Sequence, residues 1–582
     1  MKLLEAIRIV QAPAPEGAEP MSLALACGFT PDHFLTLLAA HVRAGKSKRI
    51  LKTSVGRFGD LVGNVERLAA LSGTANEAIV VPIEWTDLDE RLGLRRLGGW
   101  LPEAFGDMIR TVNSRLLRIE AAVCRLASSS IVALSFPTLP LPPISYLPPN
   151  QAGCFETRLR EEIAAAAARL AKIARVRIAD PQAVDRCSVF SQRLDVRSEL
   201  TYGYPYQTPH ASALAAIFAA LIDPPLPKKG LITDLDDTLW KGIVGEVGAD
   251  QVAWDLDGHA QIHGLYQQML RSLSAAGVLL AVASKNDAAR VKEAFRRADL
   301  HVSAEHFYPM EVSWGPKSAA VSRILTAWNV GADSIVFVDD SPLELAEVKA
   351  AHPEVEGLLF PKGDEVAGYA LIEQLRECFG KLGLGAEDAM RLESLRRGAE
   401  VRVKLDAADP EAFLSTIDAV IAISDERDSL NRRPFELINK TNQFNLNGHR
   451  VTETAWLARL ADPNGFILGV TYRDKFGPLG TIGVVSGRCN GFALLLDHWV
   501  MSCRAFSRRI EHRTLSFLLE RFDADEVLLD FEPTAKNGPL QEFLAAYLEE
   551  GEQLAPGLRI TRSRIEACGP RTYHRIEEKP RE

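Results

Sequence analysis

The sequence predicts a multidomain protein of the α/β class. Its 582 residues far exceed the length at which one hydrophobic core keeps growing, so about three or four domains are expected. Between residues 230 and 340, short apolar runs alternate with amphipathic helical segments, which is typical of a parallel sheet buried on both faces. After about residue 390, apolar runs linked by glycine-containing turns favour antiparallel strands. We therefore expect α/β domains followed by an α+β domain.

The composition is that of a globular chain. Hydrophobic residues make up 47% and charged residues 25%, which excludes wholesale disorder and collagen-like repeats. The net charge is −9 and the basic residues are spread along the chain, so a nucleic-acid partner is not expected. The eight cysteines form no CxxC pair, which favours a reducing compartment. The N-terminus is a poor signal peptide and no apolar run reaches the ~20 residues of a membrane helix, so we expect a cytoplasmic protein without membrane contact.

A proline-rich segment marks the first domain boundary. Residues 136–150 and 223–230 are rich in proline, which excludes helix and interior strand, so both are expected to be loops. The second segment is the first boundary that the sequence indicates. The pattern of strands and helices changes again after about residue 385, so the expected domains are 1–225, 226–385 and 386–582.

The first domain is expected to contain another α/β sheet. Strand-like runs occur at 49–56, 79–85 and 131–137, and a helix is expected at 154–174. The segment that begins WTDLDERLG, at the end of the strand-like run at 79–85, is expected to form a loop and a surface helix. His210 lies near the end of this domain.

In the second domain, the expected strands GLIT, VLLAVA and SIVFV each end in polar residues. Asp234 and Asp236 follow the first strand, and Asp339 with Asp340 follow the last. Because ligands of parallel α/β sheets bind beyond the carboxyl ends of the strands, these carboxylates are expected to converge. Converging like charges need a cation, and hard oxygen ligands favour Mg²⁺. The opposing interpretation is a set of helix-capping aspartates, but capping needs one acid per helix rather than three within four positions.

Two further side chains of this domain suit a phosphate group. Ser284 stands at the end of the strand VLLAVA, and Lys317 opens a helix in the segment GPKSAA. A hydroxyl and an ammonium at such places can hold the oxygens of a phosphoryl group during transfer. Lys285 and Asn286 follow Ser284 and are further candidates for substrate or carrier binding.

Four segments, DLDDT, ASKN, GPK and VDDSPLE, occur in the order of the motifs of haloacid dehalogenase-type phosphatases, which this domain resembles. The resemblance implies a Rossmann-like fold. It makes Asp234 the nucleophile that takes the phosphoryl group and Asp236 the acid and base. Ser284 and Lys317 would hold the phosphoryl group. Asp340, with Asp339, Asp234 and the Asp236 carbonyl, would complete the Mg²⁺ shell. Asp237 is expected to be a structural neighbour.

The connection between the first two motifs is short. About 45 residues separate them, and these are mostly one expected helix and the segment WKGIVGEVG. Little room is left for a large cap domain, so we expect a minimal cap and a site that is open to a bulky or protein-borne substrate.

The chain as a whole resembles FkbH-like proteins, most strongly from 225 to 540. Besides the phosphatase motifs, the segments ELINKTNQFNLNGHR, RDKFGPLG, LDHWVMSCRAFSRRIEHR and PTAKNGPL support this resemblance. It implies a phosphatase and glyceryltransferase that dephosphorylates 1,3-bisphosphoglycerate and passes the glyceryl group through an enzyme thiol. The acceptor would be the phosphopantetheine of an acyl carrier protein in polyketide-type biosynthesis. The order of the steps stays open.

The third domain would then be similar to the GNAT acyltransferases. Cys503 is the candidate acyl-carrying thiol, because a helix N-terminus and neighbouring arginines would lower its pKa. The alternative is that Cys503 is a buried core cysteine with a structural role only. Arg504, Arg508 and Arg509 are candidates for binding a phosphate or an acidic carrier protein, although serine and arginine stand where the acyltransferases have glycines. A solvated basic helix start is the alternative.

The N-terminal domain resembles the degenerate SGNH-hydrolase-like part that precedes such phosphatase domains. Its candidate residues are Ser54 and His210, but Gln207 stands where the acid of the Asp-x-x-His pair would be. A docking or scaffold role is therefore favoured over hydrolysis.

Two rivals to the glyceryltransferase hypothesis stay open. One is a plain haloacid dehalogenase-type phosphomonoesterase whose last domain only binds substrate. The other is a carrier-protein docking module with a vestigial site, against which the intact pair of Asp234 and Asp236 argues. Transfer of a glyceryl group to a carrier protein distinguishes the first hypothesis from both rivals.

Overall fold

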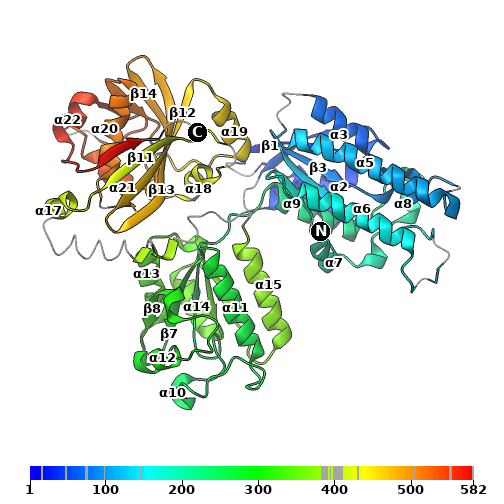
Figure 1. The fold of residues 1–582 in the computed structure, drawn as a ribbon, viewed down its shortest axis with the longest axis horizontal. Helices are drawn as coiled ribbons and strands as arrows, with labels where there is room; N and C mark the ends of the chain where they lie inside the picture. Colours follow the sequence, from blue (N-terminus) through cyan, green and yellow to red (C-terminus); the bar gives the residue numbers. More distant parts are fainter. Residues whose placement is uncertain are drawn as a thin grey trace. The chain divides into compact units, whose positions relative to one another are not determined.

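A computed structural model gives the fold of the chain (Figure 1). It describes residues 1–579 except 15–17, 46–48, 72–75, 98, 145–146, 149, 382–390, 394, 397–409, 429–430, 503–504, 507 and 550–552. The chain divides into two compact units, Met1–Pro225 and Leu226–Glu582. The second unit contains both a parallel sheet and a mostly antiparallel sheet, so the expected division at about residue 385 falls inside it.

The first unit is built on a five-stranded parallel sheet with the order β2-β1-β3-β4-β5. Its strands are β1 (Pro20–Leu25), β2 (Ile50–Val55), β3 (Ala78–Pro82), β4 (Ile131–Ser135) and β5 (Val176–Ile178). Its helices are α1 (Leu3–Gln11), α2 (Asp32–Ala44), α3 (Leu61–Ala70), α4 (Trp85–Leu88), α5 (Phe105–Leu126), α6 (Cys154–Leu170), α7 (Pro181–Cys187), α8 (Val196–Tyr202) and α9 (Thr208–Ile222). The expected α/β sheet is present.

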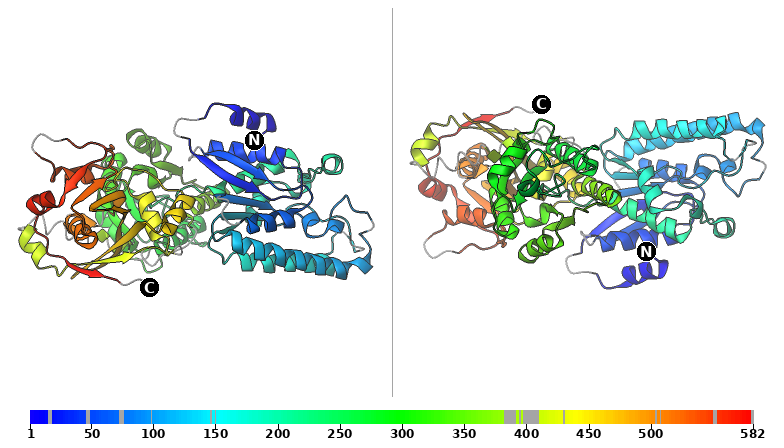
Figure 2. Two further views of the ribbon diagram at one scale, coloured as in Figure 1. Left: turned by 90° about the horizontal axis from the view of Figure 1, so that it is seen from above. Right: turned by 90° about the horizontal axis from the view of Figure 1, so that it is seen from below.

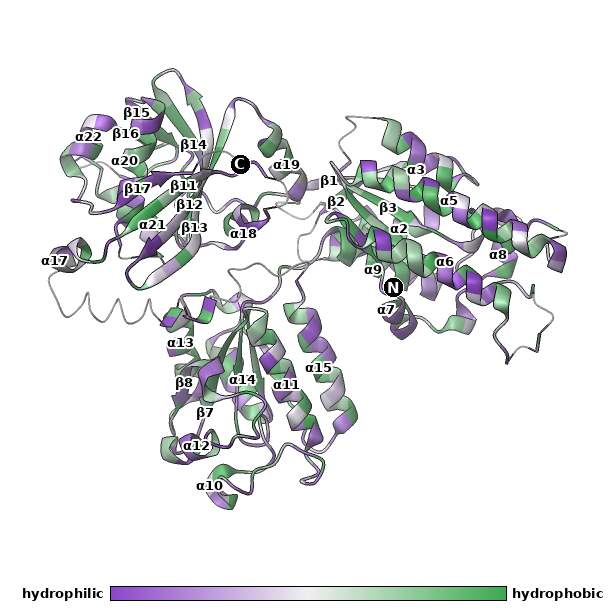
Figure 3. Ribbon diagram, in the orientation of Figure 1, coloured by the Kyte–Doolittle hydropathy of each residue, from purple (hydrophilic) through white to green (hydrophobic). Residues whose placement is uncertain are grey.

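Helices cover both faces of this sheet (Figure 2). One buried cluster joins the strands to α3, α5 and α6, and the other joins them to α1, α2 and α9. Hydrophobic and hydrophilic residues alternate along α5 (Figure 3), whose apolar side chains Met108, Val112 and Leu116 are buried. A surface helix was expected here, but Trp85 and Leu88 of α4 are buried. The helix begins three residues after β3, a strand that is buried at every position, so the chain is still in the interior where α4 starts.

The second unit begins with another five-stranded parallel sheet, in the order β10-β9-β6-β7-β8. Its strands are β6 (Gly230–Thr233), β7 (Leu279–Ser284), β8 (Phe307–Val312), β9 (Ile335–Asp339) and β10 (Glu356–Leu359). Its helices are α10 (Val244–Val247), α11 (Gln261–Ala275), α12 (Ala288–Ala294), α13 (Lys317–Trp328), α14 (Pro342–Ala351) and α15 (Glu365–Phe379). One face of the sheet packs on α11 and α15, and the other packs on α13 and α14. The predicted Rossmann-like alternation is therefore present.

The remainder of the second unit forms a seven-stranded sheet in the order β16-β15-β14-β13-β12-β11-β17. Its strands are β11 (Val420–Asp425), β12 (Gly465–Asp474), β13 (Gly477–Asn490), β14 (Ala493–Met501), β15 (Glu526–Leu529), β16 (Arg559–Thr561) and β17 (Arg575–Glu578). Its helices are α17 (Pro410–Ser415), α18 (Arg433–Lys440), α19 (Glu453–Ala461), α20 (Ile510–Phe522), α21 (Gly538–Ala545) and α22 (Arg562–Cys568). Strands β11 to β14 are antiparallel, whereas β15 runs parallel to β14. This is an α+β arrangement, as predicted.

Candidate active site

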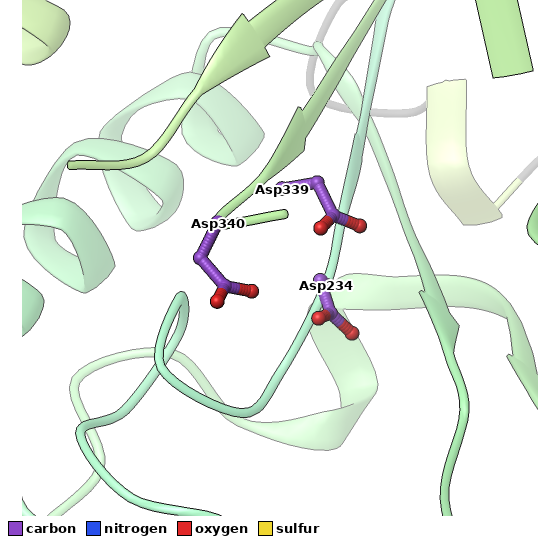
Figure 4. Close-up of side chains that lie close together, drawn as sticks. All are labelled: Asp234, Asp339 and Asp340. Atoms are coloured by element: carbon purple, nitrogen blue, oxygen red, sulfur yellow. The ribbon is translucent and has the colours of Figure 1, made fainter. Parts of the chain in front are cut away.

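The carboxyl ends of three neighbouring strands bring the predicted catalytic residues together. Asp234 directly follows β6, which lies between β9 and β7 in the sheet. Ser284 is the last residue of β7, and Asp339 is the last residue of β9. Because the strands are parallel, these residues share one edge of the sheet. Figure 4 shows the carboxylates of Asp234, Asp339 and Asp340 grouped at this edge.

The carboxylate group has the composition of a site for a hard divalent cation. One oxygen each from Asp234, Asp339 and Asp340 lies within 4.8 Å of the others. Asp234 is buried, and its Oδ1 has no hydrogen-bond partner among the described residues. A buried oxygen without a partner is costly. Oxygen ligands are those that Mg²⁺ prefers, so the residues present fit this ion.

Lys317 contacts two of the three carboxylates. Its Nζ is 2.9 Å from Asp234 Oδ2 and 2.6 Å from Asp339 Oδ2. Burial, together with the charge of Asp234, raises the pKa of Asp339 to about 7. Burial alone would lower the pKa of Lys317, but the two carboxylates raise it. The lysine therefore stays charged and supplies a fixed cation beside Asp234 and Asp339.

Asp236 has a separate set of partners. Its Oδ1 accepts hydrogen bonds from Trp240 Nε1 at 2.8 Å and Val244 N at 3.1 Å, and its Oδ2 accepts one from Asn286 Nδ2 at 2.8 Å. Burial raises its pKa. Asp236 is thus oriented by three donors outside the group that contacts Lys317, as a proton-transferring carboxyl requires. Asn286, which the sequence suggested for substrate binding, instead positions Asp236.

Asp237 and Lys362 form a second ion-paired group at the same edge. Asp237 adopts the left-handed conformation with φ 51°, and its Oδ1 accepts a hydrogen bond from Gly242 N at 2.7 Å. Lys362 Nζ lies 3.1 Å from Asp237 Oδ2 and also contacts Asp340 Oδ2. Asp340 receives a further hydrogen bond from Thr238 Oγ1 at 3.4 Å. Sequence reasoning missed Lys362, although its place just beyond β10, at the same sheet edge, was a usable signal.

Lys285 forms ion pairs with the helix that follows Asp340. Its Nζ lies 2.9 Å from Glu344 Oε1 and 3.9 Å from Glu347 Oε2, both on α14. Sequence reasoning missed these two glutamates. The geometry gives Lys285 a role in joining β7 to α14, which differs from the predicted contact with substrate or carrier.

The connection between β6 and β7 is described throughout. It contains the four-residue helix α10 and the crossover helix α11, with no separate cap domain. The geometry therefore has the minimal cap that the sequence predicts.

The candidate thiol site of the third expected domain is only partly described. Cys503 and Arg504 lie outside the described residues. Arg508 is buried, and its Nε lies 3.5 Å from the buried Asp474 Oδ2. This corrects the prediction that Arg508 is available to a phosphate or a carrier protein. Arg509 is partly exposed and pairs with Glu411 at 3.2 Å.

Ser54 and His210 of the first unit are not brought together. Ser54 is exposed on β2, at one end of the sheet. His210 is fully buried, and its Nε2 lies 2.9 Å from the hydroxyl of Thr138, which follows β4. Two strands, β1 and β3, lie between β2 and β4, so the groups are about 14 Å apart across the sheet. The predicted hydrolase-like pair is therefore wrong, because strand order cannot be obtained from the spacing of motifs.

His210 belongs instead to a buried polar network that sequence reasoning missed. Its Nδ1 lies 2.9 Å from Ser188 Oγ, and burial lowers its pKa to about 3. Thr138 Oγ1 donates to Glu84 Oε1 at 2.7 Å, and Tyr206 OH donates to the same oxygen at 3.0 Å. Burial raises the pKa of Glu84 to about 7. These groups tie β3, β4 and α9 together.

Among proteins of known structure, several chains are similar to this one. No protein-family profile and no curated protein matches the chain. Within the described residues, no helix is long and apolar enough to cross a membrane. The N-terminal part of the protein BF1531 from Bacteroides fragilis, which contains a phosphatase domain and was crystallised with Mg, aligns with a TM-score of 0.52. The identity is 17%, and the alignment covers 66% of this chain and 100% of that one.

An uncharacterized protein from Corynebacterium glutamicum also aligns, over 27% of this chain and 98% of its own. Its identity is 20% and its TM-score is 0.17, so it supports no conclusion. The first match shows that this chain shares the fold of a protein that contains a phosphatase domain.

Proposed function

We propose that the chain is a Mg²⁺-dependent phosphatase of the haloacid dehalogenase type. The observation that carries this proposal is that Asp234 and Asp236 have separate sets of partners at the sheet edge. Asp234 contacts Lys317 beside Asp339 and Asp340, whereas Asp236 is held apart by three hydrogen-bond donors. A nucleophile in a cation site next to a separately oriented acid is the arrangement that two-step phosphoryl transfer needs.

The proposed reaction has two steps. The Asp234 carboxylate attacks phosphorus, and the bond from phosphorus to the leaving oxygen breaks while Asp236 gives that oxygen a proton. Asp236 then takes a proton from a water molecule, and this water attacks the aspartyl-phosphate to release phosphate. Lys317 and Ser284 would hold the phosphoryl oxygens, since both stabilise charge beside Asp234.

The metal has one part in this scheme. Bound Mg²⁺ would neutralise the carboxylate group and the charge of the transferring phosphoryl group. Asp234, Asp339 and Asp340 are the residues that would hold it.

The test uses p-nitrophenyl phosphate as a general phosphomonoester. Wild-type protein with Mg²⁺ should release phosphate, and Asp234→Asn should abolish the release. Asp257→Asn, an exposed residue of the same domain, is the matched control and should keep full activity. Turnover by Asp234→Asn at the wild-type rate would refute the assignment of the nucleophile.

We further propose, from the resemblance of the motifs, that phosphate removal is one step of glyceryl loading. Cys503 would attack the acyl phosphate of 1,3-bisphosphoglycerate, so that a carbon–sulfur bond forms and phosphate leaves. Asp234 would remove the remaining phosphate, and the thiol of a carrier protein's phosphopantetheine would then displace Cys503. The α+β sheet with a parallel β14–β15 pair is compatible with a GNAT-like domain, but support for glyceryl transfer comes from sequence.

Intact-protein mass spectrometry tests the glyceryl proposal. The protein is incubated with Mg²⁺, 1,3-bisphosphoglycerate and a phosphopantetheinylated carrier protein. A glyceryl adduct on the carrier that Cys503→Ala loses and Cys489→Ala keeps supports it, since Cys489 is an exposed free thiol of the same sheet. Phosphate release without an adduct favours a plain phosphomonoesterase. If neither a glyceryl adduct nor released phosphate is found, the remaining hypothesis is a carrier-protein docking module.

A further inference from the structure

A cavity in the second unit lies away from the carboxylate site. Its volume is about 370 Å³, and all its lining residues belong to the second unit. One wall is the amino edge of the parallel sheet, where Lys229 precedes β6 and Leu279 begins β7. The other wall is the end of α18 at Lys440 with the segment Thr441–Gln443 that follows it. The cavity has the size of an ordinary small-molecule site.

Positive charge dominates the lining. The lining has five basic side chains and two acidic ones. The basic residues are Lys229, Arg391, Arg433, Lys440 and Lys536, and the acidic residues are Glu354 and Glu436. Burial lowers the pKa of Lys440 despite the attraction of Glu436, and the charges of Arg391 and Lys381 lower it further. Cations that crowd together in a partly dehydrated place are stabilised by a bound anion.

The same wall also offers neutral hydrogen-bonding groups. Thr441, Asn442 and Gln443 follow one another along the lining. Arg450 donates to Asn442 Oδ1, so the carbonyl end of this amide is engaged by a cation and its amino end is oriented as a donor. The apolar side chains Leu279, Trp328 and Met501 complete the lining. A ligand with an anionic group and a short organic body would satisfy both kinds of surface.

The cavity and the carboxylate site lie at opposite ends of the same strands. Lys229 stands immediately before β6, and Asp234 stands immediately after it. The four residues of β6 between them make five steps of extended chain, which separate these two positions by about 16 Å. One small ligand therefore cannot occupy both places, and the cavity is a separate site.

We propose that this cavity is a second binding site, which takes a small phosphate-bearing molecule. Phosphate is the anion that matches several cations and amide donors at once. Ser502, which precedes Cys503 in the sequence, is among the lining residues. The site does not depend on the proposed phosphatase activity.

The test is isothermal titration calorimetry of the full-length protein with inorganic phosphate in EDTA. Without a divalent cation, the carboxylates of Asp234, Asp236, Asp339 and Asp340 repel phosphate from the sheet edge, so the titration reports the cavity. We expect binding of one phosphate per chain. Lys440→Gln and Lys536→Gln should each weaken it about tenfold, as loss of a charged hydrogen-bond donor does.

Lys292→Gln is the matched control, because Lys292 is an exposed lysine on α12 outside both sites, and it should bind phosphate as the wild type does. Lys536 is exposed, so its replacement tests the cavity even if Lys440→Gln fails to fold. No phosphate binding in EDTA, or binding that both replacements leave unchanged, would overturn the proposal. Hydrolysis of p-nitrophenyl phosphate with Mg²⁺ should survive in both variants, so this result and the result for Asp234→Asn can be read separately.

Discussion

Asp234, Asp236 and Asp237 lie within four positions of the chain, and each has its own partners. Asp234 contacts a buried lysine, Asp236 receives three hydrogen bonds, and Asp237 pairs with Lys362. Asp237 has a left-handed backbone, and its carboxylate accepts a hydrogen bond from Gly242 N. Residue type and spacing alone do not distinguish the last two aspartates, whereas their hydrogen bonds do.

Lys362 is expected to compete with the metal. It neutralises Asp340, one of the carboxylates that would hold Mg²⁺, and it is half-exposed, so its ion pairs contribute about 0.5–1 kcal/mol each. Lys362→Met should therefore lower the Mg²⁺ concentration that gives half-maximal phosphatase activity, about two- to fivefold. The measurement is a Mg²⁺ titration of p-nitrophenyl phosphate hydrolysis. A higher Mg²⁺ requirement would show instead that Lys362 positions Asp340.

Arg508 is expected to act in folding. Its guanidinium pairs with Asp474 and both side chains are buried, so removal of the arginine leaves an uncompensated carboxylate. Arg508→Met should lower the free energy of unfolding by about 3–5 kcal/mol, whereas Arg509→Met at a more exposed ion pair should cost about 1 kcal/mol or less. Urea-induced unfolding measures both. A fully stable Arg508→Met protein would return this residue to the candidates for carrier binding.

At the scale of elements, the sequence predicts most directly the strands that are apolar throughout. Strands β6, β7 and β9 are buried at every position, and they carry the catalytic candidates. The edge strand β10, which has only one buried residue, was not predicted, and Lys362 beyond it was therefore missed. Likewise, the strand order that separates Ser54 from His210 depends on long-range pairing, which local patterns do not contain.

The network around His210 links β3, β4 and α9, and its protonation affects the stability of the first unit. The pKa of His210 lies near 3 in the folded state, below its ordinary value of 6.5. A lowered pKa gives stability that is present above pH 6.5 and is lost as the pH falls toward 3. Glu84 has the opposite effect, since its pKa is raised to about 7. Its contribution to the stability of the fold is complete below pH 4.5 and is lost as the pH rises through 7.

His210→Asn should separate these effects. At pH 7 the variant loses the contacts with Thr138 and Ser188, which costs about 1–3 kcal/mol. At pH 5 the wild type has lost about 2 kcal/mol through His210 and the variant has not, so the difference in stability should shrink. Urea-induced unfolding at the two pH values measures the difference. A difference that widens at pH 5 would contradict the assignment of a neutral, buried His210.

At the scale of the whole molecule, the first unit and the catalytic candidates are separate. Buried clusters on both faces of the first sheet give Met1–Pro225 its own core, and every residue of the carboxylate site belongs to Leu226–Glu582. The sequence predicts this separation from the proline-rich segment at 223–230, because proline denies that segment to helix and strand.

A shortened chain of residues 226–582 should therefore hydrolyse p-nitrophenyl phosphate at a rate similar to that of the full chain. Circular dichroism checks that the shortened chain is folded, and a phosphate-release assay with Mg²⁺ gives the rate. A folded but inactive chain would mean that the first unit contributes to catalysis.

The short connection between β6 and β7 has a kinetic consequence. Enzymes that pass a reactive group to a chosen acceptor close over the site to keep water out. This connection, with only α10 and α11 in it, supplies no such cover. In the proposed mechanism, the aspartyl-phosphate on Asp234 would therefore be open to water, and its hydrolysis to phosphate would compete well with transfer to another acceptor.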